Sequence, residues 1–329
     1  MREMTVTFVN VGYGEAVLLR CPDPACRDGE FVMLVDGGSA DPAEFADRSS
    51  GRIPLWEYLK TDGAPGHIDL MVNTHPHEDH VCGMLRAAAF LPPRELWQIL
   101  PPEFCRRAMR PLDTGKAQNM SQEKFLQALN DCAALCRTVR DCGGTVRVPR
   151  PGEETELCAG LRCRVLGPSE RKLSELRERS EALYAERDEA AFLRRLTQLD
   201  AAMNNYSLIL LLVFQGTRLL LPGDTNRAGY SEIDPAALRA ALFKVGHHGQ
   251  ADGADEPLLD AVRPKAVVCC ASSDRRYNSA EPSLLQMIRG KGAALYFSDC
   301  PPAPDGELPP HGALVFTVGK DGIKSAKYL

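Results

Sequence analysis

The chain has 329 residues, 44% of them hydrophobic and 25% charged, which suits one large globular domain or two modest ones. Its formal net charge of -5 argues against a global electrostatic attraction to nucleic acid, but it leaves room for a local basic cleft. Aromatic residues make up only 6% of the chain, which is little material for a base-stacking platform.

From the composition of the N-terminal residues, we expect no secretory signal peptide. Residues 1–5 lead directly into an alternating apolar stretch, without the basic segment, apolar core and small-residue cleavage site of a signal peptide. The most apolar window, 208–214, is too short to span a bilayer. We therefore expect a cytoplasmic protein with no membrane segment and with reduced thiols at its twelve cysteines.

The first half of the chain alternates short apolar runs with longer periodic segments. Short apolar or alternating runs bounded by turn signals predict strands over 5–11, 16–20, 31–35 and 68–72. Apolar residues at helical spacing predict helices over 42–60, 81–90 and 121–141. This alternation is typical of α/β proteins.

A long, highly charged stretch, 169–202, follows two further predicted strands at 145–148 and 161–166. We expect it to be helical and to break into a hairpin near Ala185. Its leucines are too scattered for sustained heptads, so a long coiled coil is not expected. The stretch is better interpreted as an insertion that covers part of the surface or contacts another subunit.

The last third returns to the alternation of strands and helices. Predicted strands cover 207–214, 218–221, 243–245, 266–270, 294–297 and 313–318, with helices over 235–242, 257–262 and 282–289. The polar residues of interest follow directly after strands. Because the end of a strand is rigid and its loop can present side chains, this is where α/β folds place their chemistry.

Five of the seven histidines fall in two short clusters, one at 75–80 and one at 247–248. His75 and His77 lie two apart in an extended segment, so they face the same side and can share one divalent ion. Asp79 and His80 come after the turn and can face a second ion. Imidazole nitrogen and carboxylate oxygen are the ligands of borderline divalent metals, so the spacing predicts a metal site.

These motifs resemble the metallo-β-lactamase superfamily, and within it the branch that includes the hydrolase domain of the DNA-uptake channel protein ComEC. The landmarks occur in family order at 8–16, 34–38, 75–80, 204–208, 220–224 and 244–249. The resemblance implies an α/β fold, a four-layer αβ/βα sandwich with a metal site at one edge. We expect one such domain over 1–329 with a helical insertion at about 169–203, as a stand-alone soluble relative.

The resemblance also implies two divalent ions, zinc or manganese, and a set of metal ligands: His75, His77, Asp79, His80 and Asp224, with one of His247 and His248 as the late histidine. The sequence does not choose between the last two, and the other would make a supporting or substrate contact. No histidine lies between His80 and His247, where many members carry one more ligand. The first ion would then have only His75, His77 and Asp224 as protein ligands.

The reaction that fits is hydrolysis by a metal-activated water, with Asp79 and His248 as the candidate catalytic side chains. We expect Asp79 to orient the water and to take its proton. Phosphodiesters are the leading substrate class, as for a nuclease or phosphodiesterase, with nucleic acid as a candidate partner. Candidate substrate contacts are Asn205, Lys244, Arg276 and Tyr277.

Two alternatives stand beside this hypothesis. The same chemistry would serve another ester, a thioester or a lactam, because a metal-activated water attacks many electrophiles. A different class of protein is a non-catalytic regulatory or interaction protein with a degenerate metal site. Its charged insertion would then be the surface for a partner or for an oligomer.

Overall fold

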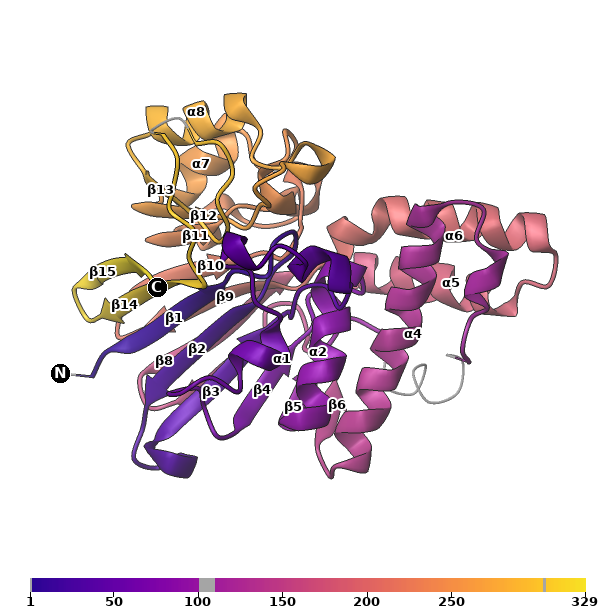
Figure 1. Cartoon of the computed structure of the whole chain (residues 1–329), viewed down its shortest axis with the longest axis horizontal. Helices are drawn as coiled ribbons and strands as arrows, with labels where there is room; N and C mark the ends of the chain where they lie inside the picture. Colours follow the sequence, from indigo (N-terminus) through magenta and orange to yellow (C-terminus); the bar gives the residue numbers. More distant parts are fainter. Residues whose placement is uncertain (1, 101–109, 304–305) are drawn as a thin grey trace.

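The computed structural model describes residues 2–100, 110–303 and 306–329, and its strands form two mixed sheets (Figure 1). The first sheet has the order β15-β14-β1-β2-β3-β4-β5-β6 and is parallel from β3 to β6 and antiparallel elsewhere. Its strands are β1 (Met4–Val9), β2 (Val17–Pro22), β3 (Glu30–Val35), β4 (Ile68–Val72), β5 (Pro93–Trp97), β6 (Thr145–Arg147), β14 (Ala313–Gly319) and β15 (Gly322–Tyr328).

The second sheet has the order β13-β12-β11-β10-β9-β8-β7. It is parallel from β10 to β13 and antiparallel from β10 to β7. Its strands are β7 (Glu154–Cys158), β8 (Leu161–Gly167), β9 (Ile209–Phe214), β10 (Thr217–Leu221), β11 (Leu242–Lys244), β12 (Ala266–Cys269) and β13 (Ala294–Phe297).

Helices cover the outer faces of both sheets (Figure 1). On the first sheet lie α1 (Leu55–Tyr58), α2 (Glu78–Phe90) and α4 (Met120–Asp141), and on the second lie α7 (Glu256–Val262) and α8 (Pro282–Gly290). Two further helices, α5 (Glu170–Ala185) and α6 (Glu189–Met203), extend to one side beyond α4. Short 3-10 helices lie at 27–29, 42–45, 48–50, 114–116, 204–206, 227–230, 235–238, 247–249 and 276–278.

The alternation of side chains along the strands of the second sheet separates two cores. Leu210 and Leu212 of β9 pack in the core cluster that also holds the residues of the first sheet. Ile209 and Leu211, between them in sequence, pack in the cluster that holds the buried residues of α7 and α8. Because β9 is buried on both faces, apolar side chains are expected on both. Each fully buried leucine stabilises the folded state by about 1.5–3 kcal/mol. The predicted four-layer αβ/βα sandwich is confirmed.

Several predicted elements differ from the structure. The helix predicted over 42–60 is wrong, because Gly51 adopts a left-handed φ of 79° and Pro54 interrupts the segment, leaving two 3-10 turns and the short α1. The helix predicted over 235–242 is a single 3-10 turn that ends before β11. The stretch 169–202 forms two helices, α5 and α6, separated at 186–188 as the prediction near Ala185 allowed. Strands β5, β7 and β15 were not predicted.

Within the described ranges, no helix combines the length and the hydropathy that crossing a bilayer requires. The cysteines of the same ranges are all free.

A buried ion-pair network joins loops that are far apart in the sequence. The guanidinium of Arg52 lies 2.8 Å from Glu44 Oε1 and 2.9 Å from Asp299 Oδ2, and its side chain is 10% exposed. Glu44 in turn accepts a hydrogen bond from the backbone N–H of Tyr13. Arg52 and Glu44 therefore tie the segment between β3 and β4 to the loops after β1 and β13.

We predict that Arg52→Ala lowers the free energy of unfolding by about 3–5 kcal/mol, because it leaves the buried carboxylate of Asp299 without its cation and leaves Glu44 with Arg276 alone. The matched control is Arg162→Ala, whose partner Glu154 is 46% exposed, and it should cost less than about 1 kcal/mol. Urea unfolding followed by circular dichroism measures both variants. Equal midpoints for the two variants would contradict the prediction.

Candidate active site

The polar residues that follow four strands meet at one edge of the sandwich. Asp36 follows β3, His75 lies three residues after β4, Asp224 lies three residues after β10, and His248 lies four residues after β11. Because β3 pairs with β4 in parallel and β10 pairs with β11 in parallel, the carboxyl ends of each pair open at the same edge.

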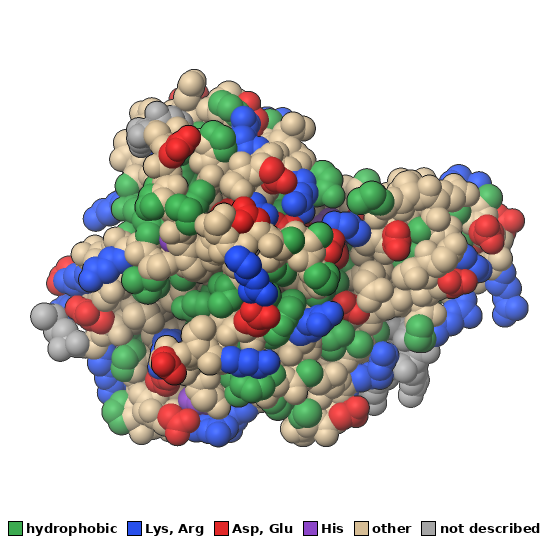
Figure 2. All heavy atoms as spheres, viewed as in Figure 1, with side chains coloured by type: hydrophobic (Ala, Val, Ile, Leu, Met, Phe, Trp, Pro, Cys, Tyr) green, Lys and Arg blue, Asp and Glu red, His purple; other side chains and the backbone are tan. Residues whose placement is uncertain are grey.

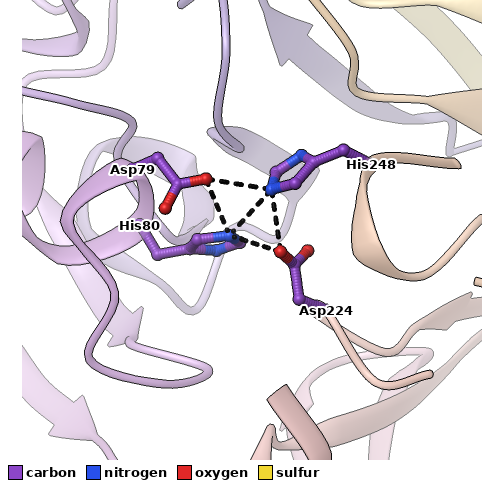
Figure 3. A group of neighbouring side chains, drawn as sticks. All are labelled: Asp79, His80, Asp224 and His248. Atoms are coloured by element: carbon purple, nitrogen blue, oxygen red, sulfur yellow. Dashed lines mark hydrogen bonds and ion pairs between the residues drawn. The ribbon is translucent and has the colours of Figure 1, made fainter. Parts of the chain in front are cut away.

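Four side chains converge there from three separate segments, Asp79, His80, Asp224 and His248 (Figure 3). His248 Nε2 lies 2.9 Å from Asp79 Oδ2 and 2.8 Å from Asp224 Oδ2. His80 Nε2 lies 3.3 Å from Asp224 Oδ2 and 3.4 Å from His248 Nε2. All four ligand atoms lie within 4.8 Å of one another.

The outer contacts of the two histidines leave only acceptors facing one another in this cluster. His80 Nδ1 lies 2.8 Å from Asp36 Oδ2, and a carboxylate can only accept, so the proton of this ring sits on Nδ1. His248 Nδ1 donates to the carbonyl oxygen of Cys270 at 2.7 Å. In the tautomer with the proton on Nδ1, each ring turns the lone pair of its Nε2 towards the two carboxylates, and such an arrangement of four acceptors suits a cation held between them.

The donor set fits a borderline divalent ion such as zinc or manganese. Two imidazole nitrogens and two carboxylate oxygens are common ligands, and tetrahedral ligands at about 2.0–2.1 Å from an ion stand roughly 3.3 Å apart. Without an ion, the cluster draws in protons instead. Burial alone would lower the pKa of His248, but Asp224 and Asp79 outweigh it and raise that pKa to about 9. The same demand for positive charge raises the pKa of His80, against the effect of burial.

His75 and His77 form a second, smaller pair of candidate ligands beside this cluster. His75 Nε2 lies 3.0 Å from His77 Nδ1, and the His75 ring lies 4.2 Å from the ring of His80, centroid to centroid. Burial, then the neighbouring His80 and His77, hold the pKa of His75 well below its usual value, so this ring is neutral and able to bind a metal. His75 is completely buried, whereas His77 is partly exposed and lines the pocket.

The structure brings His248, and not His247, to the cluster. Both residues adopt left-handed backbone conformations, with φ of 48° at His247 and 50° at His248, and the chain turns sharply between them. His247 Nδ1 pairs instead with Asp252 at 2.8 Å, and its Nε2 faces the amide of Gln250 at 3.0 Å. The sequence could not choose between the two because only the backbone conformation decides which ring points inwards.

Lys244 is not at the pocket surface, where a substrate contact was predicted, and that assignment is corrected. Its side chain is fully buried beneath the cluster, and its Nζ lies 3.0 Å from Asp224 Oδ1 and forms an ion pair with Glu15. Burial would lower the pKa of Lys244, but Glu15 and Asp224 raise it well above the usual value, so it stays charged. Lys244 thus holds the oxygen of Asp224 that faces away from the histidines.

Close backbone packing places His80 beside its carboxylate partner. Gly83, one turn after His80 in α2, touches the loop that follows Asp36, and a Cβ at this position would lie 1.9 Å from the carbonyl oxygen of Gly37. Any other residue would push α2 away from the loop. The glycine therefore allows Asp36 to reach the ring of His80.

A pocket of about 530 Å³ opens over the cluster. Its lining residues include Tyr13, His77, Asp79, Lys124, Asp224 and Tyr277. Tyr13 packs on the ring of His248, with centroids 4.5 Å apart, and Tyr277 packs on Tyr13 at 5.1 Å. The predicted substrate contact Tyr277 thus lies at the pocket, with 55% of its surface exposed.

The other two predicted substrate contacts lie beside the pocket. Arg276 pairs with Glu44 and lies 5.9 Å from the centre of the Tyr13 ring. For the predicted contact Asn205, it is the neighbouring Asn204 that lines the pocket, whereas the side chain of Asn205 lies beside Gly229. The helix α6 contributes a residue that was not predicted, Asp200, which lines the pocket next to His77.

The sequence analysis also did not predict that Asp36 would hold His80 or that Lys244 would hold Asp224. Asp36 had a usable signal, since it ends a buried strand in one of the motifs that carry the resemblance. Asp200 had none, because it lies in a helix in which charged residues are frequent.

Among known proteins, the chain is similar to ComE operon protein 3 of Bacillus subtilis (strain 168), with 30% identity over 295 residues. The match covers 87% of this chain and 31% of that protein, so the chain spans less than a third of this relative's length. No family model matches the chain.

Solved structures similar to the chain include zinc-bound PqqB from Methylobacterium extorquens, at 11% identity and a TM-score of 0.44, covering 89% of this chain and 97% of that one. Another is a HARLDQ-motif mutant of a metallo-β-lactamase from Cronobacter sakazakii, at 14% identity and a TM-score of 0.35, covering 72% and 75%. The predicted resemblance to a ComE relative is confirmed over 87% of this chain, and the two sheets of the chain itself define its fold.

We predict that His248→Ala and His247→Ala differ in their effect on zinc affinity. His248→Ala removes one of four converging ligands and should lower zinc affinity by more than about 100-fold, beyond the 10–100-fold typical of an outer partner. His247→Ala should keep zinc affinity within about threefold of wild type, because its ring does not reach the cluster. Zinc titration in competition with a chromogenic chelator measures both. Loss of affinity in the His247 variant alone would contradict the assignment.

Proposed function

We propose that this chain, with the sandwich and the motifs of metallo-β-lactamase superfamily hydrolases, is a metal-dependent hydrolase that acts on phosphodiesters. The observation that carries the proposal is the convergence of four acceptor atoms from Asp79, His80, Asp224 and His248 below an open pocket. A purely structural metal site is normally closed by its ligands, whereas this one borders a pocket large enough for a substrate.

The ligand arrangement supports two ions, zinc or manganese. Asp79, His80, Asp224 and His248 would hold one ion, and His75 and His77 would hold the other beside it. When bound, such ions supply Lewis acidity and lower the pKa of a bound water towards about 7. A pair of ions suits phosphodiesters because it stabilises both the entering and the leaving oxygen.

Asp79 is the member of the cluster best placed to handle a proton. Its carboxylate is 13% exposed and lines the pocket, while the side chains of His80 and His248 are fully buried. Burial alone would raise the pKa of Asp79, but His80 and His248 lower it, so the group is ionised. It can orient an attacking water through one oxygen and accept its proton.

Tyr13, which lines the pocket and packs on His248, supplies a neutral donor. Burial, then the carboxylates of Asp79 and Asp224, raise the pKa of Tyr13 well above its usual value, so the phenol keeps its proton. In the pocket it can donate to an oxygen on which negative charge develops. Two cations lie near Tyr13 and the pocket: Lys124, which lines the pocket 3.5 Å from Glu78, and Arg276, which pairs with Glu44 and lies 5.9 Å from the centre of the Tyr13 ring.

Surface charge favours local recognition of the phosphodiester over a long nucleic-acid track. Over the face shown in Figure 2, basic and acidic side chains are interspersed. A polynucleotide that lay across this face would meet carboxylates as well as cations, which weakens binding through the backbone phosphates. Cyclic or short nucleotides are therefore the first natural substrates to test.

A second candidate is the hydrolysis of a carboxylic ester or lactone. It is favoured by the apolar part of the pocket wall, formed by Tyr13, Met120, Phe125 and Tyr277. Met120 is 70% exposed, which leaves an apolar surface at the mouth of the pocket that could pack against an acyl chain.

We predict that the protein loaded with zinc or manganese hydrolyses bis(p-nitrophenyl) phosphate and loses this activity on chelation. His77→Ala should lower kcat/KM by more than about 100-fold, since it removes a ligand and not an outer partner. The matched control is His67→Gln, at the amino end of β4, which should keep the activity. Hydrolysis of bis(p-nitrophenyl) phosphate and of p-nitrophenyl acetate is followed by the absorbance of the released p-nitrophenol.

The two substrates distinguish the candidates. Turnover of the acetate without the phosphodiester would overturn the phosphodiester proposal in favour of the ester. Bound zinc without turnover of either would favour the non-catalytic, regulatory alternative.

A further inference from the structure

Helix α6 reaches the metal site through one carboxylate. Asp200 Oδ1 lies 3.1 Å from His77 Nε2, and the two side chains are 23% and 19% exposed. The other oxygen of this carboxylate, Oδ2, accepts a hydrogen bond from Ser121 Oγ of α4 at 2.9 Å. Asp200 thus has a defined position between two helices and the ligand.

The outer contacts of His75 and His77 fix which nitrogen of each ring carries the proton. A carboxylate accepts only, so the proton of neutral His77 sits on Nε2 and its Nδ1 keeps the lone pair. Thr74 Oγ1 donates to Asp36 Oδ2 at 2.6 Å, so it accepts from His75 Nδ1 at 3.0 Å, and the His75 lone pair is on Nε2.

These two assignments leave a pair of acceptors facing each other. His75 Nε2 and His77 Nδ1 are 3.0 Å apart, and with both lone pairs directed inwards no hydrogen bond joins them. Two acceptors at this distance repel unless a cation lies between or beside them. The second ion of the proposed function would supply it, and the orientation of His77 would then depend on Asp200.

We propose that Asp200 is a positioning residue of the metal site, through which the α5–α6 hairpin fixes His77 with Nδ1 turned to the ion that His75 and His77 would share. The inference rests on the proposed function in so far as it requires a metal at His75 and His77. It assigns the hairpin a place in the site, because α6 supplies the carboxylate that orients a ligand held by a loop after β4.

The hairpin is attached firmly enough to hold this carboxylate in place. Leu196, Leu199 and Met203 of α6 are buried in the main core cluster. Gln122 Nε2 of α4 donates to Thr197 Oγ1 at 3.1 Å, one turn of α6 before Asp200. Thr197 therefore offers a matched control, since it joins the same two helices without touching His77.

The test measures zinc binding and not turnover. Wild type, Asp200→Ala, Asp200→Asn, Asp200→Glu and Thr197→Val are titrated with zinc in competition with a chromogenic chelator. Cobalt is then bound in place of zinc, and its visible absorption reports the geometry at each site. Circular dichroism and unfolding midpoints show whether each variant is folded.

In wild type we expect about two ions per chain. Asp200→Ala should bind one ion as wild type does and the other about 10–100-fold more weakly, which is the usual effect of removing an outer partner of a ligating histidine. Asp200→Asn should be as weak as the alanine variant or weaker, because its amide can donate to Nε2 and so stabilise the wrong tautomer of His77. Asp200→Glu should recover part of the affinity, and Thr197→Val should bind both ions as wild type does.

Two results would overturn the inference while the proposed function stands. One is Asp200→Ala binding both ions within about twofold of wild type, and the other is Thr197→Val losing the same ion as Asp200→Ala, which would make the effect one of helix packing. Wild type that binds only one ion, with Asp200→Ala unchanged, would also overturn it. Failure of wild type to bind any zinc would instead overturn the proposed function, and the inference with it.

Discussion

The site depends on carboxylates that are buried side by side. Glu15, Asp36 and Asp224 are all at most 2% exposed, and Asp79 completes the group. Charges of one sign at this depth repel strongly unless cations lie among them. The chain supplies one permanent cation, Lys244, and places histidines at the remaining positions. The fold thus creates a demand for positive charge at the edge of the sandwich, which the proposed divalent ions would satisfy through the ligand atoms that converge there.

The position of Lys244 shows how this constraint orders the surroundings. Its ammonium group neutralises Glu15 and one oxygen of Asp224, which leaves the other oxygen of Asp224 for the histidines. An exposed lysine could not do this, because its charge would be screened and its side chain mobile. The opening motif around Glu15 and the late motif around Lys244 are therefore linked by a buried ion pair, although more than two hundred residues separate them in sequence.

Local patterns in the sequence were enough to predict the layered fold and the residues that follow its strands. The alternation along β9 and the histidine spacing after β4 each reflect a single element, so they can be read without knowing the rest of the chain. The helix predicted over 42–60 failed because Gly51 and Pro54 break it, although its apolar spacing looked helical. The choice of His248 over His247 depends on backbone torsions, and the burial of Lys244 depends on a partner in another sheet. Neither feature can be predicted from a short window of sequence.

The two halves of the proposed metal site differ in what holds them. The ligands Asp79, His80, Asp224 and His248 come from the first turn of α2 and from loops after two parallel strands of the second sheet, and Asp36 and Cys270 fix their orientation from neighbouring strands. His77 is held from outside the sheets, by a carboxylate on a helix that packs at one end of the sandwich. A change in the hairpin can reach His77 without disturbing the four-ligand cluster, because the cluster has no contact with Asp200. If the proposed two ions bind, the affinity of one would vary with the hairpin, while the affinity of the other would be set by the sheets.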